Sequence, residues 1–501
     1  MRAHPVHAAA LGLLLLTAPA TAGVTVGSKA FPESWILGEA LAEETRALGV
    51  ADVEHRSNLG GTEIVYQALR SGSVDVYPEY TGTLLEVILH APRPVALPAM
   101  RAAMAKEGLG VSEPIGFNDS YALAVTRAVR ERYALRTISD LARHPELKLG
   151  LTHEFMGRPD GYAGLAAHYG LRMKHVVGIQ HELAYTALAS GRIDVTDIYT
   201  TDAQIERLGL HVLEDDRGFF PRYDAVWLYR LDLAAREPRA LEAILALTGK
   251  IDEARMIRAN ARVVLGGQTF RQSADSLLAE ALGRAPARKP AEADVAGSIL
   301  RNTGQHLKLV ALSLLVAVLI GVPLGVIATR SPLIGSTILS LTGLLQTIPS
   351  LALLALLIPL FGIGVAPALI ALFLYSLLPI VRNTYVGLTT IPVPLAEAAA
   401  AIGLSPRAQL FRVRLPMASP AIMAGIKTSA VINVGTATLA ALIGAGGLGE
   451  PILSGIQLRQ NSLILQGAIP AAVLALLVQR AFDLIDLVAV PRGLRLPPIK
   501  G

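Results

Sequence analysis

Five long apolar runs lie in the part of this 501-residue chain that follows residue 305, and they constrain its fold more than any other feature. Each run approaches the roughly 20 residues that an α-helix needs to cross the hydrocarbon core of a membrane. We therefore expect an all-α membrane domain over residues 305–490, with about five transmembrane helices. The expected spans are residues 307–328, 334–360, 365–381, 421–443 and 463–478.

The basic residues of this half indicate which way the spans run. If the first span begins outside the cell, Arg330, the arginine-rich loop at 382–420 and a tail at 491–501 all fall on the same side. Loops rich in arginine and lysine stay on the cytoplasmic side of a bacterial membrane. The net charge of +5 therefore reports membrane topology rather than a nucleic-acid partner, and we expect a multi-pass protein of the cytoplasmic (inner) membrane.

Residues 23–283 carry a different pattern, in which short β-rich runs alternate with amphipathic helical segments. The expected strands are 24–27, 74–77, 147–151 and 194–199, and the expected helices are 33–48, 62–70, 161–169 and 183–190. This alternation is typical of an α/β fold. The segment is longer than one small lobe requires, so we expect two lobes, the second over about residues 123–222. A linker rich in alanine, proline and charge follows at 284–304.

The first 22 residues are typical of a signal peptide. Basic Arg2 precedes an apolar run at 8–17, and Ala20-Thr21-Ala22 has the small-x-small cleavage pattern. The run is short for a membrane span, so we expect cleavage after Ala22, with a retained anchor as the alternative. In both cases the domain that follows lies outside the cytoplasm.

The sequence offers no catalytic set. The chain has no cysteine, which excludes disulfides and thiol chemistry. Gly444, Gly446 and Gly449 fit G-x-G-x-x-G, but they follow a membrane span and open no βαβ unit. A P-loop is missing, so the chain cannot hydrolyse ATP by that machinery. A crowded set of side chains lacks the H-E-x-x-H register of a zinc site: His153, Glu154, His168, His175 and His181. We expect no enzyme, and an intramembrane enzyme is the most distant alternative.

The tyrosines indicate a binding site instead. Eleven of the thirteen precede the linker, and four stand where a strand meets a polar loop: Tyr80, Tyr121, Tyr199 and Tyr223. Ligands of α/β domains gather at the carboxyl ends of strands. If the four rings converge, their faces form a box for a quaternary ammonium, each ring contributing about 0.5–2 kcal/mol without a hydrogen bond. For any one of them, a half-buried core position is the alternative.

Motifs within residues 24–283 resemble those of the osmoprotectant-binding proteins of glycine betaine, choline and carnitine importers. The matching segments are 27–29 (Gly-Ser-Lys), 58–62 (Asn-Leu-Gly-Gly-Thr), 77–83 (Tyr-Pro-Glu-Tyr-Thr-Gly-Thr), 119–123 (Asp-Ser-Tyr-Ala-Leu), 158–161 (Arg-Pro-Asp-Gly) and 199–204 (Tyr-Thr-Thr-Asp-Ala-Gln). The resemblance implies a two-lobed periplasmic domain of type II. It also implies the ligand contacts: an aromatic box of Tyr80, Tyr121, Tyr199 and Tyr223, a betaine carboxylate held by Lys29, Thr83 and Arg158, and Asp119 near the ammonium.

Residues 302–490 resemble the matching type I ABC permease. The motifs are Gln-Thr-Ile-Pro-Ser at 346–350 and an ATPase-docking loop marked by Glu397, Ala398, Ala399, Gly403, Leu415 and Pro416. The resemblance implies a separate cytoplasmic ATPase that carries ATP and Mg, and a second copy of this chain to complete the pathway. It implies no cofactor or metal in the chain itself. An ordinary amphipathic connector is the alternative for the loop.

Together the two resemblances imply a fused binding protein and permease of an ATP-driven importer for small quaternary-ammonium zwitterions. Glycine betaine, carnitine, choline and ergothioneine all remain open as substrates, because fused relatives include importers of ergothioneine, a betaine of histidine. Ser34 stands where many relatives have glutamine, which weakens the transfer of choline specificity. A membrane-anchored binding protein or sensor for the same ligands, without transport, is the alternative.

Overall fold

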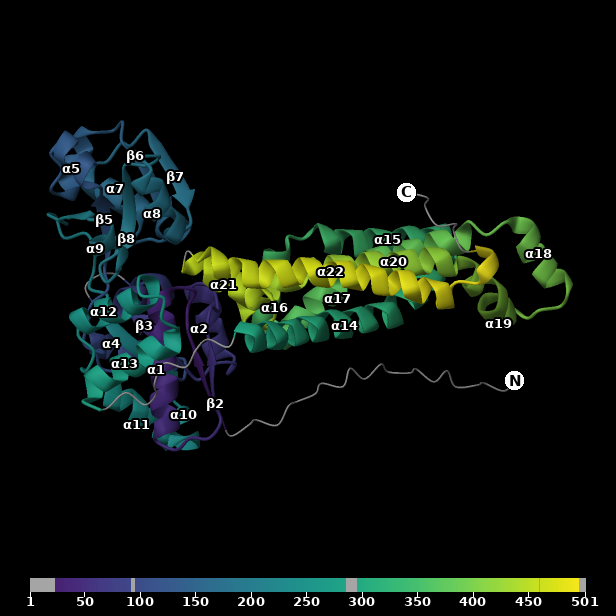
Figure 1. The fold of residues 1–501 in the computed structure, drawn as a ribbon, viewed down its shortest axis with the longest axis horizontal. Helices are drawn as coiled ribbons and strands as arrows, with labels where there is room; N and C mark the ends of the chain where they lie inside the picture. Colours follow the sequence, from purple (N-terminus) through teal and green to yellow (C-terminus); the bar gives the residue numbers. More distant parts are fainter. Residues whose placement is uncertain (1–22, 92–94, 285–294, 459, 495–501) are drawn as a thin grey trace, which may run out of the picture.

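The computed structural model describes residues 23–91, 95–284, 295–458 and 460–494 (Figure 1). An α/β part lies at one end of a long bundle of helices. The expected signal peptide, part of the expected linker and most of the expected tail lie outside the described residues.

The first lobe is built on a mixed five-stranded sheet. Strands β1 to β3 run parallel, and β10 runs antiparallel between β3 and β4. In spatial order the strands are β2 (Val53–Arg56), β1 (Val24–Gly27), β3 (Val76–Tyr80), β10 (Ala225–Arg230) and β4 (Leu109–Val111). The helices are α1 (Pro32–Ala47), α2 (Thr62–Arg70), α3 (Thr81–Thr83), η1 (Leu84–Ile88), α4 (Leu97–Lys106), α10 (Leu233–Arg236), α11 (Pro238–Leu247), α12 (Glu253–Val264) and α13 (Phe270–Leu282).

The second lobe has a mixed five-stranded sheet of its own. In spatial order the strands are β7 (His175–Ile179), β6 (Lys148–Thr152), β8 (Val195–Tyr199), β5 (Tyr121–Val125) and β9 (His211–Leu213). The helices are α5 (Arg127–Tyr133), η2 (Ile138–Arg143), α6 (His153–Gly157), α7 (Tyr162–Tyr169), α8 (His181–Ala189) and α9 (Gln204–Arg207).

The chain crosses between the lobes twice, before β5 and after β9. The two crossing segments pair with each other: the Asp119 N–H donates to the Tyr223 carbonyl at 3.1 Å, and the Ala225 N–H donates to the Phe117 carbonyl at 3.0 Å. Two paired connections of this kind let one lobe move against the other without losing its own sheet. The expected two-lobed α/β fold is confirmed.

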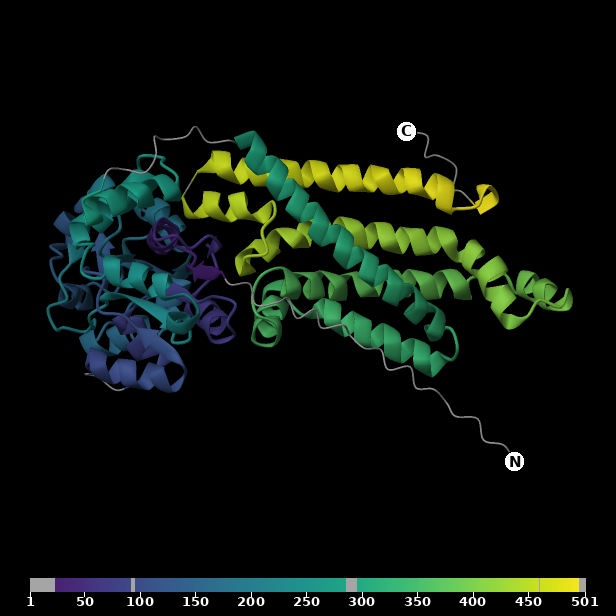
Figure 2. The same ribbon diagram turned by 90° about the horizontal axis from the view of Figure 1, so that it is seen from below.

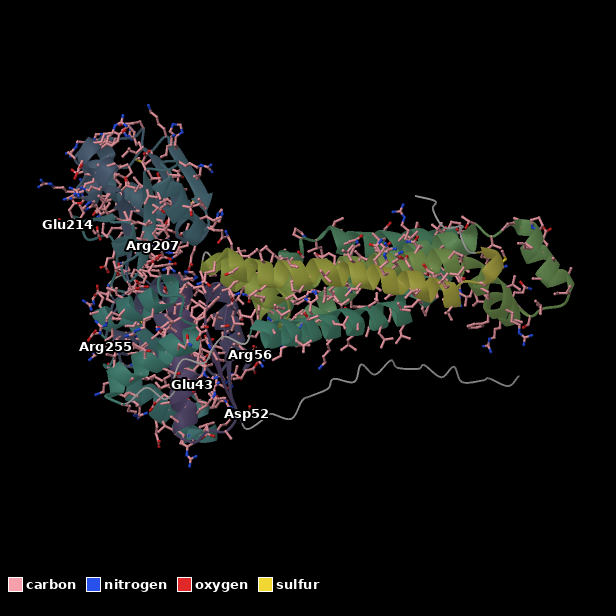
Figure 3. All side chains as sticks on the ribbon, in the orientation of Figure 1. Glu43, Asp52, Arg56, Arg207, Glu214 and Arg255 are labelled. Atoms are coloured by element: carbon pink, nitrogen blue, oxygen red, sulfur yellow. The ribbon has the colours of Figure 1, made fainter. Side chains whose placement is uncertain are left out.

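The membrane half consists of long apolar helices. Among the described residues, four helices are long and apolar enough to cross a membrane, and the bent pair α15–α16 is a fifth span if the two helices count as one. The bounds are α14 (Val295–Ala328), α15 (Pro332–Thr347), α16 (Ser350–Phe361), α17 (Val365–Thr389), α20 (Leu415–Thr436), η4 (Ala437–Ile443), α21 (Gly449–Gln457), α22 (Asn461–Ala489) and η5 (Arg492–Leu494). Side-chain nitrogen and oxygen atoms are dense over the lobes and sparse along the bundle (Figure 3). The expected helical membrane domain is confirmed.

Two details of this half differ from the sequence-based expectation. The span expected over 334–360 is bent by 97° between α15 and α16. The bend falls at Ile348 and Pro349, because proline disfavours a helical conformation in the residue before it. Helix α14 begins at Val295, inside the stretch expected to be linker, although its apolar character starts only near residue 307.

The first lobe packs against the near end of the bundle (Figure 2). Helix α2 contacts α16, and Leu59 shares one hydrophobic cluster with Leu357 and Ile443. A side chain at Gly444 would place its Cβ 2.9 Å from the Leu59 side chain, and the φ of +71° at this position also favours glycine. The helices of the predicted docking loop lie at the opposite end of the bundle: α18 (Val393–Ala401) and α19 (Pro406–Gln409), with the turn η3 (Leu410–Arg414).

Candidate ligand-binding site and coupling loop

Aromatic rings from both lobes form a continuous arc where the two sheets face each other. In order along the arc they are Tyr80, Phe31, Tyr199, Tyr121 and Tyr223, and successive ring centroids lie 6.3, 5.7, 5.1 and 5.7 Å apart. Faces at such spacings can surround a small cation. The structure therefore brings together the four tyrosines predicted for the box and adds Phe31 to them.

Strand direction explains why these residues meet. Tyr80 and Tyr199 are the last residues of β3 and β8. Strand β5 runs antiparallel to β8, so its first residue, Tyr121, pairs directly with Tyr199. Strand β10 runs antiparallel to β3, and its first residue, Ala225, pairs with Tyr80. Tyr223 comes two residues earlier and therefore reaches the same edge.

The tyrosine hydroxyls are engaged at the rim of the arc. Tyr80 donates a hydrogen bond to Glu33 at 2.7 Å, and Tyr223 donates one to Asp160. Burial, together with the neighbouring Glu33 carboxylate, raises the pKa of Tyr80 well above its ordinary value. The hydroxyls thus stay neutral at physiological pH, and the rings act through their faces.

One end of the arc carries a guanidinium. Arg158 donates from Nε and Nη2 to Asp160 at 2.8 and 2.6 Å, and its Nη1 lies 3.4 Å from the Thr83 hydroxyl oxygen. Its central carbon lies 5.2 Å from the ring centroid of Tyr121 and 5.9 Å from that of Tyr223. Nη1 and the Thr83 hydroxyl offer donors suited to a carboxylate at this end.

Lys29, the third residue predicted to hold an anion, is bound differently. Its Nζ donates to Glu79 at 2.5 Å, both side chains are buried, and Nζ lies 5.6 Å from the ring centroid of Tyr80. The Lys29 backbone N–H donates to the Ser34 hydroxyl at 2.9 Å. Ser34, which stands where many relatives have glutamine, therefore helps to fix the turn that carries Lys29.

Two carboxyl groups lie at the acidic end of the site. The Thr201 hydroxyl oxygen is 2.5 Å from Glu33 Oε2 and 2.9 Å from Asp119 Oδ1. Burial raises the pKa of Asp119 well above its ordinary value, and the Glu33 charge raises it further. Burial also raises the pKa of Glu33, partly offset by hydrogen bonds from Thr201, Tyr80 and Asn260. The pair therefore retains a proton more readily than free carboxyls, and a bound cation would favour its ionised form.

Buried hydrogen bonds join the lobes, so the cleft is closed. Thr201 of the second lobe bonds Glu33 of the first, and Asn260 Nδ2 of the first lobe donates to the Thr201 carbonyl at 3.2 Å. The Arg158 contact with Thr83 also crosses the cleft. Closure completes the site, because the arc takes rings from both sides of the cleft.

The sequence-based prediction missed Phe31, Glu33, Asp160, Thr201 and Asn260. Asp160 and Thr201 stand inside the segments 158–161 and 199–204, next to residues that were chosen, so a signal for them existed. Asn260 gives no such signal, because it reaches Glu33 across 227 positions of sequence.

The histidine-rich stretch of the second lobe forms no metal cluster. His181 Nε2 lies 3.0 Å from Asp202 Oδ2. Burial favours a higher pKa for Asp202, but hydrogen bonds from His181 and Tyr185 outweigh it and lower the pKa. Over the described residues, no group of three or more His, Cys, Asp or Glu side chains could hold a metal ion.

The predicted coupling residues lie together at the end of the bundle farthest from the cleft (Figure 1). Glu397, Ala398 and Ala399 are on α18, Gly403 follows it, and Leu415 and Pro416 begin α20. Gly403 has φ of +77°, a left-handed conformation that ends the helix and favours glycine. Nearby apolar side chains are open to solvent, with Ile402 76% and Phe411 67% exposed.

Fold and site together define the class of protein: a two-lobed binding domain joined to a permease. Residues 22–280 match the model of the substrate-binding domain of ABC-type glycine betaine transport systems, and residues 321–492 match the inner membrane component of binding-protein-dependent transport systems. The chain belongs to these families and fuses them in one polypeptide.

Several known proteins are similar to parts of the chain. The choline transport system permease protein OpuBB of Bacillus subtilis is 42% identical over 199 residues, which are 40% of this chain and 92% of that protein. The ergothioneine transport permease/ergothioneine binding protein EgtU of Helicobacter pylori is 39% identical over 268 residues, 51% of this chain and 47% of that protein. A solved structure described as a glycine betaine/carnitine/choline ABC transporter is 31% identical, covers 51% of this chain and 97% of its own, and has a TM-score of 0.44.

Proposed function

We propose that this chain binds a small quaternary-ammonium compound, either a zwitterion or choline, and carries it across the membrane as part of an ATP-driven importer. The observation that carries this proposal is the arc of five rings between a guanidinium end and a paired-carboxyl end. Ring faces attract a trimethylammonium that cannot donate hydrogen bonds. Arg158 and Thr83 suit its carboxylate, and Asp119 and Glu33 supply negative charge near the cation.

The coupling loop supports transport rather than binding alone. Glu397, Gly403, Leu415 and their neighbours lie at one end of the bundle, and the binding lobes lie at the other. The loop carries Arg407, Arg412 and Arg414, which favours the cytoplasmic side and leaves the lobes outside the cell. The exposed Ile402 and Phe411 suit the docking of a separate ATPase, which would bind ATP and Mg.

Because the two domains are fused, the binding domain stays covalently joined to the permease. Tethering converts delivery into an intramolecular step, at an effective concentration that reaches the millimolar range for a short linker. A second copy of the chain would complete the pathway, because five spans are few for a closed channel. We place the substrate among the compounds of the relatives: glycine betaine, carnitine, choline and ergothioneine.

Uptake by cells tests this proposal. Cells of the source organism with and without the gene are supplied with each radiolabelled compound, and accumulation is followed before and after ATP depletion. We expect loss of ATP-dependent uptake of at least one compound in the deletion strain. Ligand binding that persists while no compound is ever accumulated would support a membrane-anchored sensor instead.

A further inference from the structure

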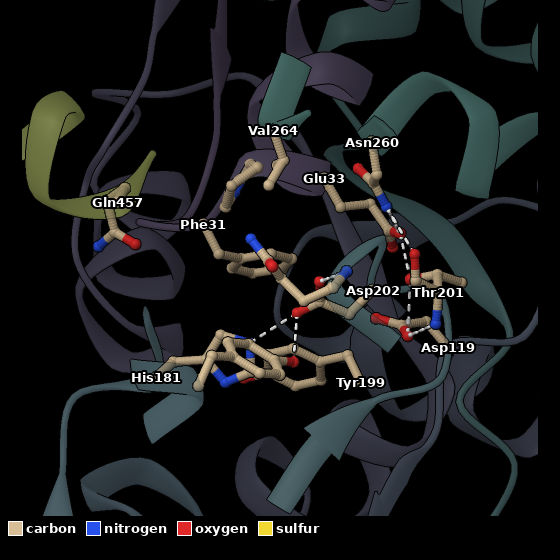
Figure 4. Close-up of a pocket in the computed structure, with 13 residues that line it drawn as sticks. Phe31, Glu33, Asp119, His181, Tyr199, Thr201, Asp202, Asn260, Val264 and Gln457 are labelled. Carbon is tan, nitrogen blue, oxygen red and sulfur yellow. Dashed lines mark hydrogen bonds and ion pairs between the residues drawn. The ribbon is translucent and has the colours of Figure 1, made fainter. Parts of the chain in front are cut away.

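A cavity beside the aromatic arc is lined by residues from both halves of the chain (Figure 4). It lies at the acidic end of the site described above, and the residues it shares with that site are Phe31, Glu33, Asp119, Tyr199, Thr201 and Asn260. Gln457, the last residue of α21 in the permease half, forms part of its wall. Its volume of about 50 Å³ suits a few water molecules or one small polar group.

Three amide oxygens at this cavity are buried and lack a hydrogen-bond partner among the described residues: Asn260 Oδ1, Gln204 Oε1 and Gln457 Oε1. The orientation of Asn260 is fixed, because its Nδ2 donates to Glu33 at 3.0 Å and to the Thr201 carbonyl at 3.2 Å. Its oxygen is therefore the free acceptor, on a side chain only 5% exposed. Buried polar groups are rarely left unpaired, so three around one cavity indicate an occupant.

The charged residues that line the cavity indicate which kind of chemical group binds there. Glu33, Asp119 and Asp202 line the cavity, and none of the described lining residues is a lysine or arginine. A ligand carboxylate would be repelled by these carboxylates when they are ionised. A hydrogen-bond donor or a positive charge would satisfy them.

We propose that this cavity is a second subsite, which binds an N–H- or O–H-bearing arm of the quaternary amine and is completed by Gln457 of the permease. The inference rests on the proposed function and narrows its substrate class. The carboxylate of the ligand lies at the Arg158 end, its ammonium lies along the rings, and its arm reaches away from both. The substrate is then larger than glycine betaine.

The position of Gln457 also gives the permease a direct contact with the ligand. A wider groove shares Phe31, His181, Tyr199 and Gln457 with the cavity and continues along Leu453 in the permease. A ligand that leaves the cleft on this side passes Gln457 first. The same amide therefore recognises the arm in the closed cleft and stands at its exit toward the membrane half.

A matched pair of ligands tests the subsite. Nα-trimethylhistidine and Nα-trimethylphenylalanine have the same ammonium and carboxylate and a flat ring, but only the former has a ring N–H. Calorimetry on the intact chain in lipid nanodiscs, at about pH 8 where the imidazole is neutral, gives the ratio of their dissociation constants. We expect the histidine compound to bind about tenfold more tightly or better.

Substitution of Gln457 tests the permease contribution. Gln457→Leu removes the amide, and we expect the ratio to fall about threefold or more. Gln466→Leu, on α22 and outside the cavity and the groove, is the matched control and should keep the wild-type ratio. Thermal melting establishes that both variants are folded.

The outcomes separate the two proposals. Equal binding of the two ligands would overturn the subsite while leaving the proposed function intact, and an unchanged ratio in folded Gln457→Leu would overturn the role of the permease. Failure of both ligands and of glycine betaine, choline and carnitine to bind would overturn the proposed function itself.

Discussion

The rings and the hydroxyls of the tyrosines in the arc make different contacts. The rings of Tyr199 and Tyr121 lie 5.1 Å apart and present faces to the cleft, whereas the hydroxyls of Tyr80 and Tyr223 bond carboxylates at its rim. A trimethylammonium interacts with faces alone. Substitutions can therefore test the contribution of a tyrosine ring apart from that of its hydroxyl.

Tyr199 gives the simplest test of the ring. Tyr199→Ala should weaken binding of the best quaternary amine about tenfold, because one wall of the arc is lost, while Tyr199→Phe should stay within about twofold of the wild type. Calorimetry on the intact chain measures both. Tyr133→Ala, on the outer helix α5, is the control. Equal losses for the Ala and Phe variants would assign recognition to the hydroxyl instead.

The charge of Asp119 should lower the stability of the unliganded chain and strengthen the binding of a cation. Burial and Glu33 raise its pKa in the folded chain above the unfolded value, so the folded state binds protons more tightly and the unliganded chain loses stability as pH rises through the folded pKa. Asp119→Asn keeps an acceptor for Thr201 but removes the charge. We expect it to raise the melting temperature at neutral pH by a few degrees, corresponding to about 1–2 kcal/mol, and to weaken cation binding about tenfold.

Tryptophan fluorescence across pH 5–8 measures this effect selectively. Both tryptophans, Trp35 and Trp227, are buried in the first lobe, so the signal reports the binding half. The stability gain of Asp119→Asn should shrink toward acidic pH, where Asp119 itself is protonated. A gain that is independent of pH would show that the carboxylate is not the cause.

Among the helices, the geometry of the predicted coupling loop depends on how α18 ends. Gly403 stops the helix with φ of +77°, and no side chain or backbone atom crowds the position where a Cβ would stand. A substitution there acts through backbone strain alone. The consequence should be confined to this loop, because the cleft lies at the other end of the bundle.

Gly403→Val should therefore separate transport from binding. A β-branched residue in the left-handed region costs about 1–2 kcal/mol, which disfavours the present loop geometry. We expect cellular uptake to fall more than about tenfold with ligand affinity unchanged. Gly170→Val imposes a similar strain at φ of +68° at the end of α7, far from the loop, and should leave uptake near normal. Normal uptake by cells that carry the Gly403→Val variant would show that the geometry of this loop is not needed for coupling.

At the scale of the whole molecule, the sequence was most informative where pattern and geometry coincide. Helix α2 occupies the predicted residues 62–70, and the tyrosines at strand ends converge because strand direction dictates it. The bend at Pro349 was readable in principle, since proline was visible inside the expected span. Membrane helices were predictable because length and composition suffice.

Long-range polar contacts could not be predicted from the sequence. Asn260 meets Glu33, and Lys29 pairs with Glu79, only because helices and strands from distant segments pack together. The contribution of Gln457 to the cavity depends on how the first lobe lies against the bundle. Packing of this kind has no periodic or local signature, so these contacts emerged only from the structure.

Calorimetry on the intact chain measures whether the cleft selects a quaternary ammonium. Glycine betaine, carnitine, choline and ergothioneine are each titrated beside the counterpart that carries a primary amine in place of the trimethylammonium. We predict micromolar or tighter binding of at least one trimethylammonium compound, with its primary-amine counterpart about 100-fold weaker. Binding of neither kind, or equal binding of both, would show that the cleft does not select a quaternary ammonium.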